Sequence, residues 1–153
     1  YGVHVGTKGG AVPRLNPKET WPLYERLSQA IQEGLVASCH DCAEGGLGVT
    51  LAEMAFGGGA GASVDLRRVP MAWVLSKEGR TDKVLFSESN GRFVVEVSPS
   101  AERKFNALMN GLNVGPVGEV QNTKSLELVG LDGKTSNWAL SDLESSWRGG
   151  LKP

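Results

Sequence analysis

The sequence predicts an α+β domain in which helices cover one face of a two-layer mixed sheet. Its length of 153 residues and its hydrophobic content of 40% suit a single compact domain. Segments with apolar residues at helical spacing alternate with short apolar runs that are typical of strands. This alternation lacks the regular βαβ rhythm of a doubly wound fold, so we expect a mixed rather than a parallel sheet.

The chain divides into two parts. Residues 1–15 begin at Tyr1 rather than Met and are rich in glycine without clear periodicity. We interpret them as a segment that leads in from an upstream domain, and we expect residues 16–153 to form one domain. The chain would then be a fragment of a longer polypeptide.

The first predicted element is a helix that begins after Asn16. The Asn16 side chain can cap the helix, Pro17 suits the first helical position, and Glu19 completes the spacing of a capping box. Gly34 is the expected stop signal. The predicted buried stripe consists of Tyr24, Leu27, Ile31 and Leu35.

A strand, a tight turn and a second helix should follow. The run "LVASCHD" predicts a buried strand over residues 35–41 that ends at His40 and Asp41. From Gly46 the apolar spacing becomes helical, and the glycines of "FGGGAGAS" should end this helix. Its predicted apolar positions are Leu47, Leu51, Met54 and Ala55.

The middle of the chain predicts two more strands and a helix. Residues 62–66 and 92–97 have the composition of strands. Residues 98–111 combine a Ser-Pro start with a glycine stop, which is typical of a helix. Another strand should begin in the region of Val117 and Val120.

The tail predicts a hairpin and a short helix. Asp132 and Gly133 provide the residues of a tight hairpin turn. Ser141 and Glu144 have the spacing of a capping box, and Trp147 should lie on the apolar side of the helix that follows.

The charge distribution argues against nucleic acid and membrane partners. With 16 basic and 17 acidic residues the net charge is −1, and the basic residues are scattered. Nucleic acid or anionic lipid would require a clustered basic surface. No apolar run reaches the roughly 18 to 20 residues that span a bilayer, and the first residues do not resemble a signal peptide. We therefore expect a soluble cytoplasmic protein.

Cys39 and Cys42 form a C-x-x-C pair, which could be a redox pair, part of a zinc site or neither. A redox pair needs its first cysteine at a helix N-terminus, but the predicted helix begins later, at Gly45 or Gly46. A structural zinc site needs four ligands, and the chain has no second cysteine pair and only His4 elsewhere. The alternative is two buried small apolar residues in a reducing compartment.

Asp41 and the glycines after it have the chemistry of a Mg²⁺-phosphate site. A carboxylate at a strand end can ligate Mg²⁺, and backbone N–H groups of Gly45, Gly46 and Leu47 can meet phosphate oxygens. Glycine would also let a phosphate approach the backbone closely. The alternative is a simple turn with an acidic cap. His40 is either a candidate catalytic residue or a packing residue.

Further acidic and polar residues surround this turn. Glu44 could favour the helix dipole or make a polar contact, and Glu53 should lie on a solvated face or at a subunit contact. A second polar cluster, "LFSESNGRF", is either a loop with turn chemistry or part of the site. Its candidate residues are Ser87, Glu88, Ser89 and Arg92. Neither a Walker A sequence nor a dinucleotide fingerprint is present.

Two stretches, "HDCAEGGLGVTLAEMAF" and "LFSESNGRFVVEV", together resemble a known family. Their order and spacing are similar to those in the C-terminal part of phosphoribosylformylglycinamidine synthases. The resemblance extends from the Tyr24 helix to the ending "GLDGKTSNWALSDLESSW". It implies the fold of the C-terminal domain of aminoimidazole ribonucleotide synthetase, which selenophosphate synthetase, thiamine monophosphate kinase and a hydrogenase maturation dehydratase share.

The resemblance also implies a function in purine biosynthesis. Such an enzyme uses ATP and Mg²⁺ to convert formylglycinamide ribonucleotide to its amidine with ammonia from glutamine, as a carbon–nitrogen ligase. Asp41 would ligate the nucleotide-bound Mg²⁺, Gly45 and Gly46 would face phosphate, and the loop from Ser87 to Arg92 would lie near the substrate.

The implied partners are the remaining synthetase domains, a glutaminase domain or subunit, and a small accessory subunit. The fragment alone should be inactive. One alternative is an auxiliary nucleotide-binding and assembly module of the same synthetase. The other is the equivalent domain of another ATP-dependent member of the superfamily.

Overall fold

The structure, a computed structural model, describes residues 14–70 and 80–149. The predicted leading segment therefore lies almost entirely outside the described residues. The helices are α1 (Pro17–Gln32), α2 (Gly46–Gly58), the 3₁₀ helix η1 (Leu66–Arg68), α4 (Thr81–Phe86), α5 (Pro99–Leu108) and α6 (Leu140–Gly149). The strands are β1 (Ser38–Asp41), β2 (Gly61–Asp65), β3 (Phe93–Glu96), β4 (Gly118–Gln121), β5 (Ser125–Val129) and β6 (Thr135–Ala139).

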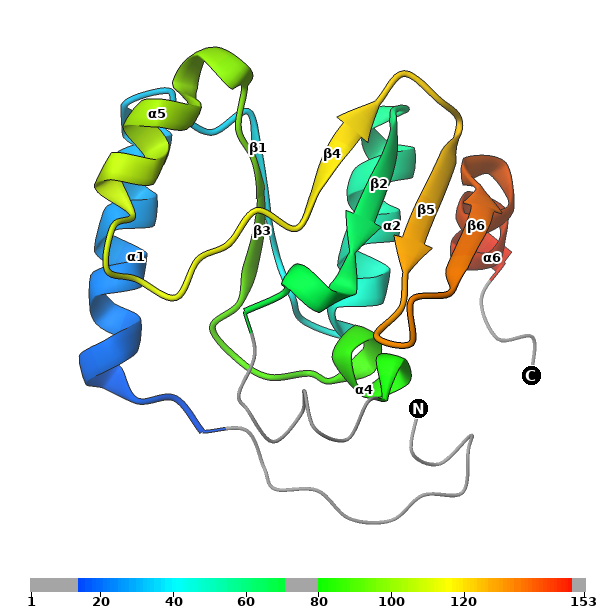
Figure 1. The fold of residues 1–153 in the computed structure, drawn as a ribbon, viewed down its shortest axis with the longest axis horizontal. Helices are drawn as coiled ribbons and strands as arrows, with labels where there is room; N and C mark the ends of the chain where they lie inside the picture. Colours follow the sequence, from blue (N-terminus) through cyan, green and yellow to red (C-terminus); the bar gives the residue numbers. More distant parts are fainter. Residues whose placement is uncertain (1–13, 71–79, 150–153) are drawn as a thin grey trace.

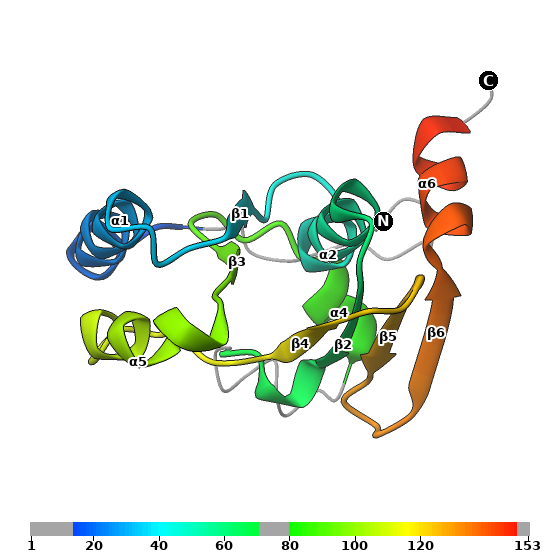
Figure 2. The ribbon, with the colours of Figure 1, turned by 90° about the horizontal axis from the view of Figure 1, so that it is seen from above.

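The predicted α+β class is confirmed, and the strands form two sheets rather than one. β1 pairs with β3 in an antiparallel ribbon. The other sheet has the order β4-β2-β5-β6, with β2 and β5 parallel and the outer pairs antiparallel. Figures 1 and 2 show α1 and α5 on one side of the ribbon and α2 on the other.

Two hydrophobic clusters correspond to these two halves. In the larger one, buried residues of α2, α4 and α6 pack against Val64 of β2 and Leu126 of β5. The smaller one joins α1 to α5 and includes Leu27 and Phe105. The β1–β3 ribbon lies between them, because Val94 packs against the larger cluster and its neighbour Val95 packs against the smaller one. Successive side chains of a strand point to opposite faces, so one short strand serves both clusters.

Helix α1 begins as predicted, but its buried face is different. The Asn16 side chain accepts a hydrogen bond from the Lys18 N–H at 3.2 Å and donates one to Glu19 at 2.6 Å. Leu27 and Leu35 are buried, whereas Ile31 is 49% exposed and Ala30 is fully buried. Ala30 belongs to the smaller cluster, which joins α1 to α5.

Two other predictions of helix boundaries were wrong. Helix α2 continues through Gly57 and Gly58 to Gly59, whose N–H donates to the Ala55 and Phe56 carbonyls. The positive φ of Gly59, 64°, turns the chain so that the Ala60 N–H also donates to the Ala55 carbonyl, at 3.2 Å. Helix α6 starts directly after β6, so Ser141 lies inside the helix and does not cap it. The short helix α4 was not predicted. Within the described residues, no helix is long and apolar enough to cross a bilayer.

Candidate functional site

Asp41 is the last residue of β1 and lies opposite Phe93 in the ribbon. The pairing continues for one residue, since the Cys42 N–H donates to the Arg92 carbonyl at 2.9 Å. The chain then turns into α2, and the Asp41 side chain is 63% exposed. The strand, turn and helix occur in the predicted order, with the carboxylate accessible at the strand end. The predicted bounds and burial of the strand were wrong, because β1 covers Ser38–Asp41 rather than residues 35–41 and its residues alternate between half-buried and exposed.

The two glycines of the turn are required by its internal packing. Gly45 and Gly46 have φ values of 75° and 63°, which disfavour other residues. A Cβ atom on Gly46 would lie 2.6 Å from the Ser87 carbonyl oxygen and 2.8 Å from that of Leu85. The start of α2 thus lies against the backbone at the end of α4 and just after it. This close contact requires glycine at position 46 whether or not a phosphate binds there.

The two polar motifs meet at this turn, although 43 residues separate them. The Gly45 N–H donates to Glu88 Oε1 at 3.0 Å. The Gly46 N–H donates to the Ala43 carbonyl at 3.1 Å. A carboxylate therefore occupies the position beside the helix N-terminus that favours an anion. A phosphate that approached the Gly45 N–H would compete with Glu88.

The loop between α4 and β3 is held in shape by its own residues. The Arg92 guanidinium donates to the carbonyls of Ser87 and Ser89, the latter at 3.2 Å. The hydroxyls of Ser87 and Ser89 lie 3.1 Å apart. These contacts fix the loop that presents Glu88 to the turn. A contact between this loop and a substrate stays a prediction.

Thr50 anchors the turn to α2, and the sequence analysis did not single it out. Its hydroxyl lies 3.1 Å from the carbonyl oxygens of both Asp41 and Gly46. The residue is only 2% exposed. A buried hydroxyl needs hydrogen-bond partners. A threonine in the first turns of a predicted helix is therefore the feature of the sequence that could have pointed to this residue.

His40 and Glu53 contact one another beside Asp41. The His40 Nδ1–H donates to the Asp41 carbonyl at 2.8 Å, and Nε2 lies 3.1 Å from Glu53 Oε2. Glu53 Oε1 accepts a hydrogen bond from the Trp147 indole at 2.7 Å. Glu53 was expected on a solvated face or at a subunit contact; both its oxygens have partners within the chain and its side chain is 25% exposed. A subunit contact stays a prediction.

The environment of the two cysteines does not favour a reactive thiol. Both are free, and the expectation that both are buried holds for Cys42 but was wrong for Cys39, which is exposed. Burial raises the pKa of both thiols; the Asp41 carboxylate adds to this for Cys39, whereas Thr50 and Arg92 partly oppose it for Cys42. A reactive cysteine needs the opposite shift. Within residues 14–70 and 80–149, no group of three His, Cys, Asp or Glu residues could hold a metal ion.

A shallow groove of about 460 Å³ opens beside Asp41. The edge of one aromatic ring faces the other in the pair Tyr24 and Phe93, whose centroids are 5.6 Å apart. The groove is lined by Tyr24, Cys39, Asp41, Cys42, Ala43, Asn90, Gly91, Arg92 and Phe93.

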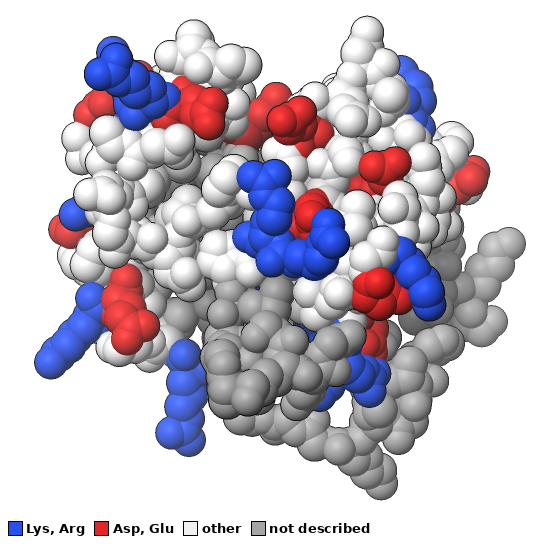
Figure 3. Space-filling view, in the orientation of Figure 1, with Lys and Arg blue, Asp and Glu red and all other residues white. Residues whose placement is uncertain are grey.

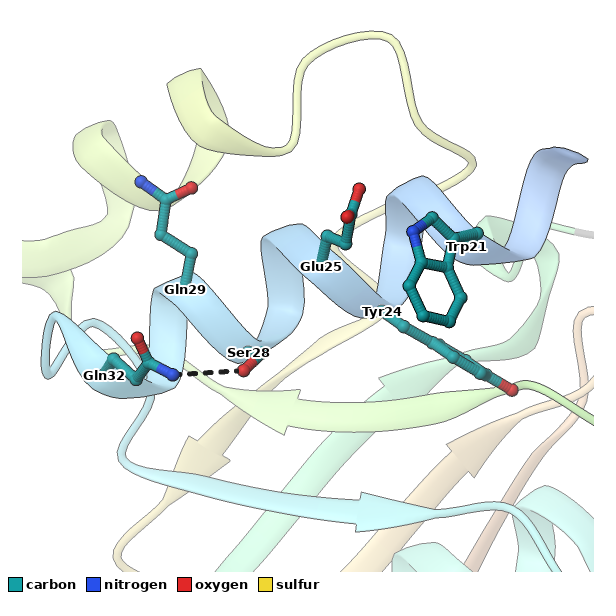
Figure 4. Close-up of a pocket in the computed structure, with 6 residues that line it drawn as sticks. All are labelled: Trp21, Tyr24, Glu25, Ser28, Gln29 and Gln32. Carbon is teal, nitrogen blue, oxygen red and sulfur yellow. Dashed lines mark hydrogen bonds between the residues drawn. The ribbon is translucent and has the colours of Figure 1, made fainter.

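A second hollow of about 380 Å³ follows one side of α1 (Figure 4). Trp21 and Tyr24 line it, and the Gln32 amide donates to the Ser28 hydroxyl at 3.4 Å. It brings no catalytic group near Asp41.

On the face shown in Figure 3, acidic and basic residues are interspersed. This distribution does not form the clustered basic surface that nucleic acid would require.

Residues 2–130 match the model of a protein family described as "AIR synthase related protein, C-terminal domain". The chain belongs to this family. Both polar motifs lie within the match, whereas α6 lies beyond it. The membership confirms the family resemblance and the fold that it implied.

Two curated relatives of this AIR synthase related domain are each named "Phosphoribosylformylglycinamidine synthase subunit PurL". The subunit from Thermococcus kodakarensis is 41% identical over 93 residues, which are 61% of this chain and 12% of the relative. The subunit from Moorella thermoacetica is 32% identical over 146 residues, or 94% of this chain and 18% of the relative. The chain thus spans less than a fifth of these relatives.

Solved structures share the fold of the domain. Thermotoga maritima PurL complexed with FGAR superimposes with a TM-score of 0.74 at 24% identity, covering 91% of this chain and 23% of that one. T. maritima PurL complexed with ATP gives 0.68 at 25% identity, covering 80% and 21%. The hydrogenase maturation protein HypE from E. coli gives 0.63 at 22% identity, covering 77% and 39%.

Proposed function

We propose that the chain is the C-terminal domain of the synthetase subunit of a phosphoribosylformylglycinamidine synthase. That enzyme would use ATP to convert formylglycinamide ribonucleotide to its amidine with ammonia from glutamine, in the cytoplasm. The main support is the hydrogen bond between Glu88 and the Gly45 N–H, which joins into one turn the two motifs that resemble this family. The names of the curated relatives agree with it.

Asp41 is the residue that would bind the Mg²⁺ of the nucleotide. Its carboxylate is exposed at the strand end, and an oxygen ligand is what Mg²⁺ prefers. The described residues offer no cluster of three ligands. The other ligands would therefore be phosphate oxygens, water and groups from other domains. A bound Mg²⁺ would neutralise charge on the transferred phosphate.

The glycine turn would contribute a helix N-terminus to the same site. The N–H groups in the first turn of α2, from Leu47 onward, have no acceptor earlier in the helix. A phosphate could meet them without displacing Glu88, whereas contact with Gly45 would require the Glu88 carboxylate to move. Candidate roles for His40, Ser87, Ser89 and Arg92 toward the substrate belong to this proposal.

The proposal implies that the site is completed by other parts of the synthetase. The chain spans less than a fifth of the curated relatives, and the fold recurs in the structure of PurLQS from Thermotoga maritima. We propose as partners the remaining synthetase domains, a glutaminase domain or subunit and a small accessory subunit. The fragment alone would then not turn over.

The second candidate is an auxiliary nucleotide-binding and assembly module of that synthetase. The observation in its favour is that the N–H groups of both glycines already have acceptors inside the fold, Glu88 for Gly45 and the Ala43 carbonyl for Gly46. In this case Asp41 would hold a nucleotide that stabilises the assembly without reacting.

Calorimetric titration of Mg-ATP into the chain and its Asp41→Asn variant tests the site. Binding that is lost in Asp41→Asn, but kept in the control Asp142→Asn, would support a Mg²⁺-nucleotide site at Asp41. Equal binding by both variants would refute the metal role.

If the unmodified chain does not bind, Asp41→Asn is made in the complete synthetase. Loss of kcat with normal folding then supports catalysis, and loss of stability with residual kcat supports assembly.

A further inference from the structure

Three side chains from three elements connect the C-terminal helix to the strand end that carries Asp41. The Trp147 indole of α6 donates to Glu53 of α2, and the other oxygen of Glu53 lies against the His40 ring of β1. The remaining ring nitrogen of His40 donates to the Asp41 carbonyl. Distances of 2.7, 3.1 and 2.8 Å make this a continuous series of polar contacts.

Glu53 joins the two ends because a carboxylate has two acceptor oxygens. Oε1 accepts the indole N–H, and Oε2 faces the imidazole. Its side chain is only 25% exposed, so these contacts are less screened by water than those of an ordinary surface pair. A glutamine could keep both contacts, because its oxygen can accept the indole N–H and its amide can donate to Nε2 of a neutral imidazole. A leucine has no hydrogen-bonding group, so Glu53→Leu removes both contacts.

The His40 ring has oxygen atoms at both nitrogens, which fix its orientation. One is the Asp41 carbonyl, which the Thr50 hydroxyl also approaches at 3.1 Å. The main chain at Asp41 is thereby held from β1 and from α2. His40 Nδ1 also lies 3.6 Å from Asp41 Oδ1, so the ring contacts the exposed carboxylate as well as the main chain.

Trp147 makes a directed contact that packing alone would not require. Its ring is 54% exposed and packs against Phe56, with 5.7 Å between the ring centroids. Contact with Phe56 could be made with the indole N–H pointing to water. Instead the N–H reaches Glu53, 94 residues earlier in the chain. Helix α6 also lies outside residues 2–130, the part that matches the family model.

We propose that Glu53 and Trp147 are positioning residues, which act through the His40 ring to orient the strand end that carries Asp41. Helix α6 is thereby coupled to the site at the start of α2. The consequence for nucleotide binding rests on the proposed function of Asp41, whereas the coupling itself does not.

Nuclear magnetic resonance of the imidazole nitrogens tests the coupling directly. The chain has two histidines, so His40→Gln assigns the signals of the other ring. The variants are Glu53→Leu, which removes both contacts of Glu53, and Trp147→Phe, which keeps a ring against Phe56 but has no N–H. Trp138→Phe is the matched control, because Trp138 lies in β6 and is also partly exposed. We expect the His40 signals to shift in both variants by more than in the control.

The same variants are then compared in Mg-ATP titrations, with the complete synthetase if the chain alone does not bind. Some residues hold a metal ligand in position without touching the metal. Loss of such a contact typically lowers the affinity for the metal about tenfold or more. We expect losses of this order in both variants and none in Trp138→Phe. A merely structural role of Trp147 would lower the melting temperature without moving the His40 signals.

The outcomes separate this inference from the proposed function. Unchanged His40 signals in Trp147→Phe would overturn the coupling, even if Asp41→Asn abolishes nucleotide binding. Shifted signals would support the coupling, even if Asp41→Asn leaves nucleotide binding intact and so refutes the role of Asp41. Losses of affinity that Trp138→Phe reproduces would overturn the positioning role.

Discussion

Gly46 is the residue at which two explanations of the diglycine turn can be compared. A Cβ atom there would lie 2.6 Å from a carbonyl oxygen, at a φ of 63°. Strain at positive φ and overpacking each cost about 1–3 kcal/mol. We therefore expect Gly46→Ala to lower the free energy of unfolding by about 3 kcal/mol, as measured by urea denaturation without any nucleotide.

Gly57 provides the control for this experiment, because nothing lies within 4 Å of a Cβ atom built there. Alanine is favoured over glycine inside a helix by about 0.5–1 kcal/mol, so Gly57→Ala should be neutral or stabilising. If Gly46→Ala were as stable as Gly57→Ala, the internal packing would not require glycine. A phosphate contact would then be the better reason for it.

The two cysteines should behave as structural residues. We expect a thiol reagent to modify one cysteine in the native chain, Cys39, and both in denaturant, because Cys42 is buried. The Asp41 carboxylate contributes to the raised pKa of Cys39, so Asp41→Asn should make that thiol react faster. Rapid modification of both thiols in the native state, or bound metal in the purified protein, would contradict this reading.

For single residues, the sequence predicted the accessible carboxylate of Asp41 and the glycines of the turn. It did not predict the side chains that keep them in position. Asp41 and Gly46 are adjacent to a strand end and a helix start, which leave local signals. Glu53 meets Trp147 across 94 residues, and no pattern of local spacing carries that information. Glu88 was a candidate for a substrate contact, and its bond to Gly45 could not be read from either motif alone.

Among the elements, those with explicit start and stop signals were predicted best. Helix α1 has its Asn16 cap, and the hairpin of β5 and β6 turns at Asp132 and Gly133 as predicted. Helix α4 is too short for apolar periodicity to show. Helix α6 starts where β6 ends, so its first turn is set by tertiary contacts of the buried Leu140 rather than by a side-chain cap.

The 3₁₀ helix η1 offers a test of pH dependence. Its cap Asp65 accepts hydrogen bonds from the Arg67 side chain, and these lower the pKa of Asp65 from 3.8 to about 2. A carboxyl whose pKa is lower in the folded state stabilises the fold fully above its unfolded pKa. This contribution is lost as the pH falls from about 4 toward 2.

Arg67→Gln should therefore raise the pKa of Asp65 toward its ordinary value, as measured by carbon NMR of the carboxyl group. It should also lower stability at neutral pH and flatten the decline of stability between pH 4 and pH 2. Arg68→Gln is the control, since Arg68 contributes only the weakest of the effects on Asp65. A pKa of Asp65 that stays near 2 in Arg67→Gln would contradict the assignment.

For the whole molecule, the division into two hydrophobic clusters was not visible in the sequence. Apolar periodicity shows that an element has a buried face, but not which other elements cover that face. The β1–β3 ribbon illustrates this limit, because Val94 and Val95 belong to different clusters. The groove beside Asp41 lies at this division, with Tyr24 of α1 on one side and Cys42 of the larger cluster on the other.

The smaller cluster should therefore open more readily than the rest of the molecule. Few buried residues hold α1 to α5, with Phe105 at the centre and Arg26 donating to the Leu108 carbonyl at 3.1 Å. Small cooperative units of this kind open without global unfolding. Phe105→Ala removes a buried ring, which typically costs about 3–5 kcal/mol. We expect backbone amides of α1 and α5 to exchange hydrogen much faster in this variant, while those of β5 change little.

Leu126→Ala is the matched variant in the larger cluster, where Leu126 is 2% exposed. Because β2 and β5 form the middle of the larger sheet, this change should accelerate exchange in β2, β5, α1 and α5 together. If Phe105→Ala accelerated exchange equally in α5 and β5, the two clusters would unfold as one unit. Separate opening would instead mean that the α1 side of the groove can move while Asp41, held through His40 and Thr50, stays in place.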